Sequence, residues 1–346
     1  MTNNEVVDKL LDAETKKSKK IRQEFLEIVQ SKSNQQYTLA ITAQPNWTTP
    51  PTDTPDLLYD LEFMQVQKLW IKYGIRGQGA KVYVIDSGID DHVSFNHLKD
   101  LKSKSFLKDD NSPKDTFGHG TWVCGKIAAQ GVGIAPRCEI ISLRCLDENG
   151  SGSTEVTNNA LQYILADKEA NVVNMSLACV TKDSKQEQLI KRLTDLGVIV
   201  VASAGNYGTD LPCYPGSFLE TLCVTATDKK DNKADFSNMG GQIDIAAPGV
   251  ACYSTYLDNK FRAMSGTSMA APIVTGLLTL GISYLKMLKI NDRKEISKIV
   301  LQALEQTASD LGPAGKDKIY GFGIINSLAF LNSPTTVGCP SILKYS

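Results

Sequence analysis

The chain contains the stretch Phe261-Arg262-Ala263-Met264-Ser265-Gly266-Thr267-Ser268-Met269-Ala270-Ala271-Pro272, where a short extended run meets a glycine turn and then a helix. Apolar residues continue to Leu288, and Pro272 falls in the first helical turn, where a missing N–H costs nothing. The amides at a helix N-terminus are unpaired and carry positive partial charge. An oxyanion formed beside Ser268 would therefore meet donors already in place. A serine here is also a preferred helix cap that needs no chemistry.

Two other stretches favour chemistry over capping. The apolar run from Lys81 ends at Asp86 and a turn, and open α/β sheets bind ligands at the carboxyl ends of their strands. His119, one of only three histidines, is flanked by glycines and opens an apolar helix. Asp, His and Ser in this order match one of the known chain orders of a catalytic triad. A turn-capping Asp and a helix-capping His are the structural alternatives for each residue taken alone.

Four motifs together resemble the active-site segments of the subtilisin-like serine peptidases, the subtilase family. They are Asp86-Ser87-Gly88, His119-Gly120-Thr121, Ala202-Ser203-Ala204-Gly205-Asn206 and Gly266-Thr267-Ser268-Met269-Ala270-Ala271-Pro272. The resemblance runs from about Trp70 to Leu331. It implies that Ser268 is the nucleophile, His119 the general base and Asp86 the residue that orients the imidazole. It also implies that Asn206 donates its side-chain amide to the oxyanion, beside the Ser268 N–H.

The same resemblance implies a peptide-binding cleft. Two segments should form the walls of the S1 pocket, Cys213 should lie near its base, Phe117 should border S2, and one edge segment should pair with an extended peptide. The S1 residues are Ser176, Leu177, Ala178, Ser203, Ala204, Gly205 and Cys213, and the edge segment is Gly150, Ser151 and Gly152. The family usually has glycine where Ala178 and Cys213 stand. We therefore expect a shallower, uncharged pocket that prefers medium apolar P1 residues such as Leu or Met.

Continuous apolar runs alternate with helical patterns, which predicts a doubly wound α/β fold whose mostly parallel sheet is covered by helices on both faces. The expected strands after the Asp86 strand are Glu139–Cys145, Val172–Ser176, Val198–Ser203, Thr221–Thr227 and Ile243–Ala246. The expected helices include Gln65–Tyr73, Thr154–Ala166, Lys185–Leu196 and Asn291–Ala308.

We expect three parts: an N-terminal extension over 1–60, a catalytic domain over 61–333 and a tail over 334–346. Within the extension, the residue patterns predict a helix over 1–33, a strand over 36–42 and a Pro-rich linker over 45–55. Subtilisin-like enzymes are often made with an inhibitory pro-segment, and this one would be short. A packed or frayed extension without inhibitory function is the open alternative.

The composition narrows the partners and the compartment. The 346 residues hold 37 Lys+Arg and 38 Asp+Glu, a net charge of −1, which implies no nucleic acid or membrane surface as a partner. A protein or peptide substrate is what the resemblance to the subtilases implies. No apolar run is expected to reach the length that is needed to span a bilayer. The eight cysteines form no CxxC pair, and no signal peptide is visible, which favours a reducing, cytoplasmic location. Disulfides, a secreted mature form and the oligomeric state stay open.

No cofactor is expected to be required, and we predict no metal ligands. The loop Gln130-Gly131-Val132-Gly133 is short where many subtilases carry a calcium-binding excursion, and it offers too few oxygen ligands for that ion. A structural calcium elsewhere stays open.

These observations predict a serine endopeptidase that works through an acyl-enzyme. Two alternatives remain on the same fold: a peptide transpeptidase or macrocyclase, in which another nucleophile resolves the acyl-enzyme, and a catalytically silent peptide-binding module. An α/β-hydrolase is disfavoured, because no Gly-x-Ser-x-Gly elbow precedes an Asp and a His.

Overall fold

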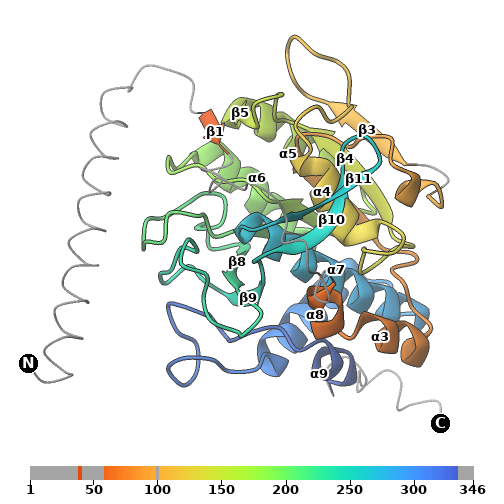
Figure 1. Cartoon of the computed structure of the whole chain (residues 1–346), viewed down its shortest axis with the longest axis vertical. Helices are drawn as coiled ribbons and strands as arrows, with labels where there is room; N and C mark the ends of the chain where they lie inside the picture. Colours follow the sequence, from red (N-terminus) through yellow and green to blue (C-terminus); the bar gives the residue numbers. More distant parts are fainter. Residues whose placement is uncertain (1–37, 41–57, 99–100, 334–346) are drawn as a thin grey trace, which may run out of the picture.

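The computed structural model describes residues 38–40, 58–98 and 101–333. Within them, one seven-stranded sheet has the order β3-β4-β2-β6-β7-β8-β9, and every neighbouring pair is parallel (Figure 1). The strands are β2 (Lys81–Asp86), β3 (Lys102–Ser105), β4 (Glu139–Arg144), β6 (Val172–Met175), β7 (Ile199–Ser203), β8 (Thr221–Thr227) and β9 (Ile245–Pro248). The predicted doubly wound α/β fold is confirmed.

Both faces of the sheet are buried along its inner strands, which explains why those strands are continuous apolar runs; the edge strand β3 is mostly exposed. Successive side chains of β2 enter opposite cores: Val82 and Val84 join one apolar cluster, and Tyr83 and Ile85 join the other. The first cluster contains α4 (His119–Ala128) and α7 (Thr267–Met287), and the second contains α5 (Thr154–Leu165) and α6 (Ser184–Asp195). Each face is thus covered by its own pair of helices.

The remaining described elements lie around this sandwich. The helices are α2 (Tyr59–Phe63), α3 (Val66–Tyr73), α8 (Arg293–Thr307), α9 (Ser327–Asn332) and the 3-10 turn η1 (Val93–Phe95). A hairpin of β10 (Cys252–Tyr256) and β11 (Lys260–Met264) packs on α4, where Ser254 Oγ and Thr255 Oγ1 donate to the carbonyls of Trp122 and Thr121. A separate pair joins β1 (Thr38–Ala40) to β5 (Ser151–Ser153).

Most expected strands and helices are found within two residues of their predicted ends, but β3, β10, α2 and α9 were not foreseen. The predicted N-terminal helix and Pro-rich linker lie outside the described residues.

The expectation that no apolar run reaches the length of a bilayer was wrong. Helix α7, with 21 residues, is long and apolar enough to cross a membrane, but 94% of its most apolar window is buried inside the protein. It is therefore the central core helix of the sandwich.

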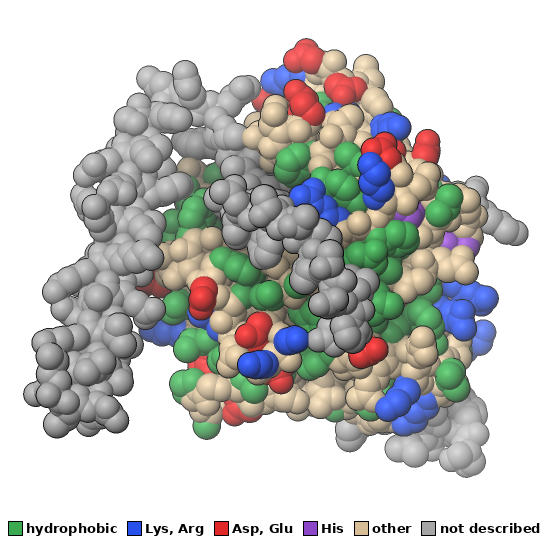
Figure 2. Space-filling model, in the orientation of Figure 1, with side chains coloured by type: hydrophobic (Ala, Val, Ile, Leu, Met, Phe, Trp, Pro, Cys, Tyr) green, Lys and Arg blue, Asp and Glu red, His purple; other side chains and the backbone are tan. Residues whose placement is uncertain are grey.

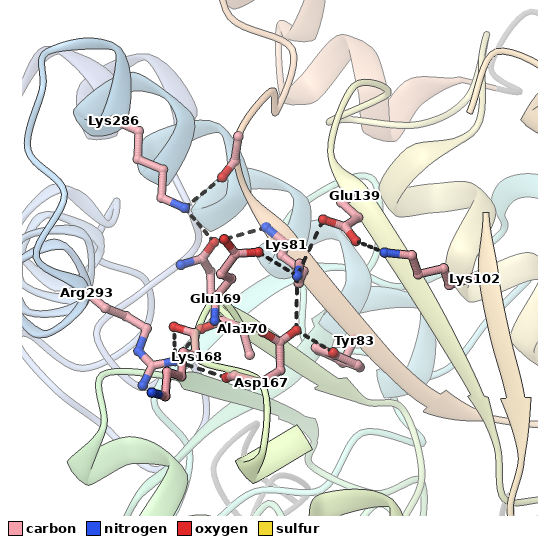
Figure 3. Close-up of polar contacts among 12 residues, drawn as sticks. Lys81, Tyr83, Lys102, Glu139, Asp167, Lys168, Glu169, Ala170, Lys286 and Arg293 are labelled. Carbon is pink, nitrogen blue, oxygen red and sulfur yellow. Dashed lines mark hydrogen bonds and ion pairs between the residues drawn. The ribbon is translucent and has the colours of Figure 1, made fainter. Parts of the chain in front are cut away.

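The amino ends of β2 and β4 carry an ion network (Figure 3). Lys81 Nζ lies 3.1 Å from Asp167, 3.0 Å from Glu169 and 3.6 Å from Glu139. Beside it, Lys286 donates to the Gly79 carbonyl, and Arg293 donates to the carbonyls of Leu196, Lys168 and Ala170. These contacts tie α7 and α8 to the edge of the sheet opposite Asp86. On the face shown in Figure 2, charged side chains of both signs are interspersed.

Candidate active site

Asp86 lies at the carboxyl end of β2, between the neighbouring strands β4 and β6, where the strand order reverses. Its two carboxylate oxygens lie 2.8 and 3.0 Å from His119 Nδ1, and both side chains are at most 1% exposed. A carboxylate against Nδ1 favours the tautomer that carries its proton there, so that Nε2 is left as the basic atom. Nε2 is buried and has no hydrogen-bond partner in the described part of the chain. The imidazole is thus oriented with its free nitrogen available.

Glycine lets the histidine helix approach Asp86. A Cβ on Gly120 would lie 2.2 Å from the carbonyl oxygen of Gly88, in the turn that follows the strand. The Gly120 N–H instead donates to Ser87 Oγ at 2.9 Å. Asp115, which is 1% exposed, accepts from the N–H groups of Phe117, Gly118 and Thr121 at 2.8–2.9 Å. These contacts fix the first turn of α4, and therefore His119.

Ser268 is the second residue of α7 and is 5% exposed. Its hydroxyl donates to the Ser176 carbonyl at 3.1 Å, and the Ser176 hydroxyl donates back to the Ser268 carbonyl at 2.9 Å. The hydroxyl thus bonds to the end of β6 rather than to His119 Nε2. In unliganded sites the catalytic hydrogen bonds are often made only when substrate binds.

Asn206 faces the same turn. Its Oδ1 accepts from the N–H and the hydroxyl of Thr267, both at 2.9 Å, which fixes the orientation of the amide. Its Nδ2 lies 3.5 Å from where a Cβ on Gly266 would stand, so the amide donor faces the serine turn. The N–H of Ser268 belongs to the unpaired amides at the N-terminus of α7, so the same turn carries a second donor.

The two expected S1 wall segments lie side by side. Ser203 Oγ donates to the Leu177 carbonyl at 3.4 Å, and Leu177, Ala178, Ser203 and Ala204 are all buried. Cys213 lies against the second segment: a Cβ on Gly205 would lie 2.7 Å from its Sγ. Burial raises the pKa of the Cys213 thiol to about 12, although the Asn238 amide donates to the sulfur at 3.3 Å. At neutral pH this thiol is therefore an uncharged, apolar group.

The expected edge segment lies against Phe117. A Cβ on Gly150 would lie 2.7 Å from the Phe117 ring, whose centroid is 6.4 Å from that of His119. Beyond Gly150, β5 pairs antiparallel with β1, with Leu39 opposite Gly152 and Ala40 opposite Ser151. The edge that was expected to bind an extended peptide is thus occupied by a segment of this chain itself.

Comparison with known proteins shows the family of this chain. Residues 77–323 match the model of the family described as the subtilase family. The chain belongs to the subtilase family.

Three relatives of this subtilase illustrate the match. It is 33% identical over 308 residues to the minor extracellular protease Epr of Bacillus subtilis, covering 86% of this chain and 46% of that protein. It is 36% identical over 298 residues to the thermophilic serine proteinase of Bacillus sp. AK1, which covers 82% of this chain and 71% of that protein. It is 38% identical over 215 residues to thermitase of Thermoactinomyces vulgaris, which covers 59% of this chain and 75% of that protein. The chain thus spans about half the length of the first of these.

Seven of the cysteines of this subtilase lie in the described ranges, and all seven are buried and free; Cys339 lies outside them. Subtilases are generally independent of cofactors, with structural calcium in some. No three His, Cys, Asp or Glu side chains gather as potential metal ligands within 38–40, 58–98 and 101–333.

Asp86, His119, Ser268 and Asn206, all predicted from the sequence, lie at the carboxyl edge of the sheet. Two supporting residues were not predicted: Asp115, which caps the turn before His119, and Asn238, which donates to Cys213. Asp115 had a local signal, because an Asp three residues before a Gly-His pair is a frequent turn and helix cap. Asn238 had none, because it reaches its partner from 25 residues away.

Proposed function

We propose that this subtilase is a serine endopeptidase in which Ser268, His119 and Asp86 form the triad. His119 Nε2 takes the proton of Ser268 Oγ as the oxygen attacks the scissile carbonyl, and it then returns the proton to the leaving amine. Asp86 holds the Nδ1 proton and stabilises the imidazolium. The observation that carries this proposal is the buried Asp86–His119 pair, whose free Nε2 has no other partner.

The serine has to leave the Ser176 carbonyl before it can bond to His119. We expect a backbone N–H of a bound peptide to take that carbonyl, which releases the Ser268 hydroxyl toward Nε2. The oxyanion of the tetrahedral intermediate would then receive the Asn206 amide and the Ser268 N–H. Water resolves the acyl-enzyme in a peptidase, whereas an amine resolves it in a transpeptidase.

A fluorophosphonate probe tests this assignment. We expect it to label Ser268, and we expect peptide substrates to gain the mass of one water across the two products. Labelling with joined peptide products would favour the transpeptidase alternative. A chain that is folded but is neither labelled nor active would be the silent binding module.

The residues before the catalytic domain are proposed to act as a pro-segment. The pairing of β1 with β5 supports this, because β1 occupies the edge of Ser151–Ser153, directly after Gly150, which packs against Phe117 next to His119. An extended segment there takes the hydrogen-bonding edge that a substrate needs. Active preparations should carry a new N-terminus between Thr48 and Leu61, and Ser268→Ala should stay full length. A full-length chain with undiminished activity after long incubation would contradict the pro-segment.

The S1 pocket is proposed to prefer medium apolar P1 residues. Its walls carry no charge, so a P1 Arg or Lys would lose its hydration without gaining a partner. Ala178 and Cys213 narrow the pocket, and large rings would overpack it. A peptide library with varied P1 residues, measured by kcat/KM, should rank Leu and Met above Arg, Lys and Trp. Arg or Lys at the top would contradict this placement of the pocket.

The cytoplasm is the proposed location, because seven buried, unpaired thiols suit a reducing compartment. Fractionation of the native source, with an antibody to this chain, tests the location.

We further propose that the enzyme needs no calcium, and treatment with a chelator should leave its activity unchanged.

A further inference from the structure

One ion pair of the molecule is completely buried on both sides. Lys126 Nζ lies 2.5 Å from Asp60 Oδ2, and both side chains are 0% exposed. Lys126 belongs to α4, seven residues and two helical turns after His119, and its ammonium lies 5.8 Å from the centre of the Trp122 ring. A buried cation keeps its charge only with such a partner, and it destabilises its surroundings when the partner is removed.

The segment that carries Asp60 is also connected to the turn that holds Ser268. Asp60 lies on α2, the first helix of the catalytic body, and the preceding Tyr59 donates its hydroxyl to the Val250 carbonyl at 2.7 Å. Val250 follows Gly249, whose carbonyl accepts from the N–H of Gly266 at 2.8 Å, two residues before Ser268. Tyr59 and Asp60 therefore bind both the helix of His119 and the backbone that supports the serine turn.

We propose that Asp60 is a positioning residue for His119, and that N-terminal processing must stop before Tyr59. With Asp60 present, Lys126 has a counter-charge inside the core, and α4 keeps its hydrogen bonds to β10. Without it, α4 has to move or hydrate to relieve the Lys126 charge, and the imidazole moves with it. This inference rests on the proposed endopeptidase function.

The central variant is Asp60→Asn, which keeps the shape but leaves Lys126 unpaired. We expect kcat per fluorophosphonate-labelled site to fall by about 10- to 100-fold, because small displacements of a catalytic group are that costly. KM should stay within about twofold, since the substrate cleft is not touched. A merely structural role would lower the amount of labelled enzyme and leave kcat per labelled site unchanged.

Two further variants complete the test. Asp60→Leu with Lys126→Met removes both charges at similar volume, and kcat per labelled site should return close to that of the wild type. Asp167→Asn is the matched control: it converts a carboxylate to an amide in the ion network at the opposite end of β2, and kcat per site should not change. If Asp60→Asn is not labelled at all, Lys126→Met replaces it, because it breaks the same pair from the other side and leaves one buried charge without its partner. The same loss of kcat at constant KM is expected.

The outcomes separate this inference from the function beneath it. A wild-type chain that is neither labelled nor active contradicts the proposed endopeptidase. An active wild type with an unchanged kcat in Asp60→Asn overturns only the positioning role. A double variant as impaired as Asp60→Asn overturns it too, because the loss would then not come from an unpaired charge. Edman sequencing of labelled chains should find N-termini at or before Tyr59, and a fully active chain that starts at Asp60 or later overturns the processing limit.

Discussion

The two ends of the central sheet use polar side chains in opposite ways. At the carboxyl end, Asp86, His119 and Ser268 are nearly inaccessible to solvent, and His119 Nε2 is left without a partner. At the amino end, Lys81 is surrounded by three carboxylates, and Arg293 is held by backbone carbonyls (Figure 3). Unmet hydrogen-bonding capacity in a buried group costs stability and is retained where chemistry needs it. Satisfied groups at the other end compensate for that cost.

The largest contrast between the two ends should come from Ser268→Ala. Removal of the nucleophile of a subtilisin triad lowers turnover by about 10⁶-fold, and we expect a loss of that size in the hydrolysis of casein or a peptide. The thermal midpoint should hardly change, because the hydroxyl makes one neutral hydrogen bond. Undiminished cleavage by the purified variant, free of host proteases, would contradict the triad.

The second test concerns Asn206, whose amide is oriented by two hydrogen bonds from Thr267. Asn206→Ala should lower kcat by about 10²–10³-fold with little effect on KM, because the amide acts only on the oxyanion. Asn206→Asp is the matched comparison, since it keeps the acceptor for Thr267 but loses the donor, and it should be as impaired. Steady-state kinetics decide the matter, and an Asn206→Asp variant with wild-type kcat would remove Asn206 from the mechanism.

A smaller effect is expected from Cys213→Gly in the S1 pocket. Loss of the side chain should open space beside Gly205 and raise kcat/KM for P1 Phe relative to P1 Leu by about tenfold, the size of a one- or two-methylene difference in an apolar pocket. Cys213→Ser is the control that keeps the volume. An unchanged ratio in the glycine variant would show that Cys213 does not line S1.

The smallest effect on catalysis, and a measurable one on stability, should come from Asp167→Asn at the amino end. Burial works to raise the pKa of Asp167, but the Tyr83 hydroxyl, the Glu169 N–H and Lys81 together lower it. A carboxyl whose folded pKa is lowered stabilises the protein above its unfolded pKa of about 3.9, and this stability is lost as pH falls through the folded pKa. The variant should lose on the order of 1 kcal/mol near neutral pH, and this difference should vanish in acid. Urea unfolding near neutral pH and in acid measures this difference in the free energy of unfolding. A variant whose kcat falls would contradict the view that the amino end of the sheet serves stability alone.

The sequence predicted the sheet well because its strands are buried on both faces and therefore appear as uninterrupted apolar runs. It failed where an element is exposed or short: β3, Lys-Ser-Lys-Ser, carries no apolar signal, and β10 mixes buried and half-exposed residues. The candidate catalytic residues were found because motifs in chain order identify them. Asp60 and Lys126 carried no signal, because 66 positions separate two charged residues that, like most of their kind, were expected at the surface.

The pairing of β1 with β5 also has a kinetic consequence. Because the two strands belong to one chain, their association does not depend on protein concentration, and the local concentration of β1 at β5 is on the order of millimolar for a short tether. A peptide substrate at micromolar concentration would compete poorly against such a neighbour. Progress curves of the intact chain should therefore begin with a lag whose length is the same at every enzyme dilution if cleavage occurs within one molecule, and which lengthens on dilution if one molecule cleaves another.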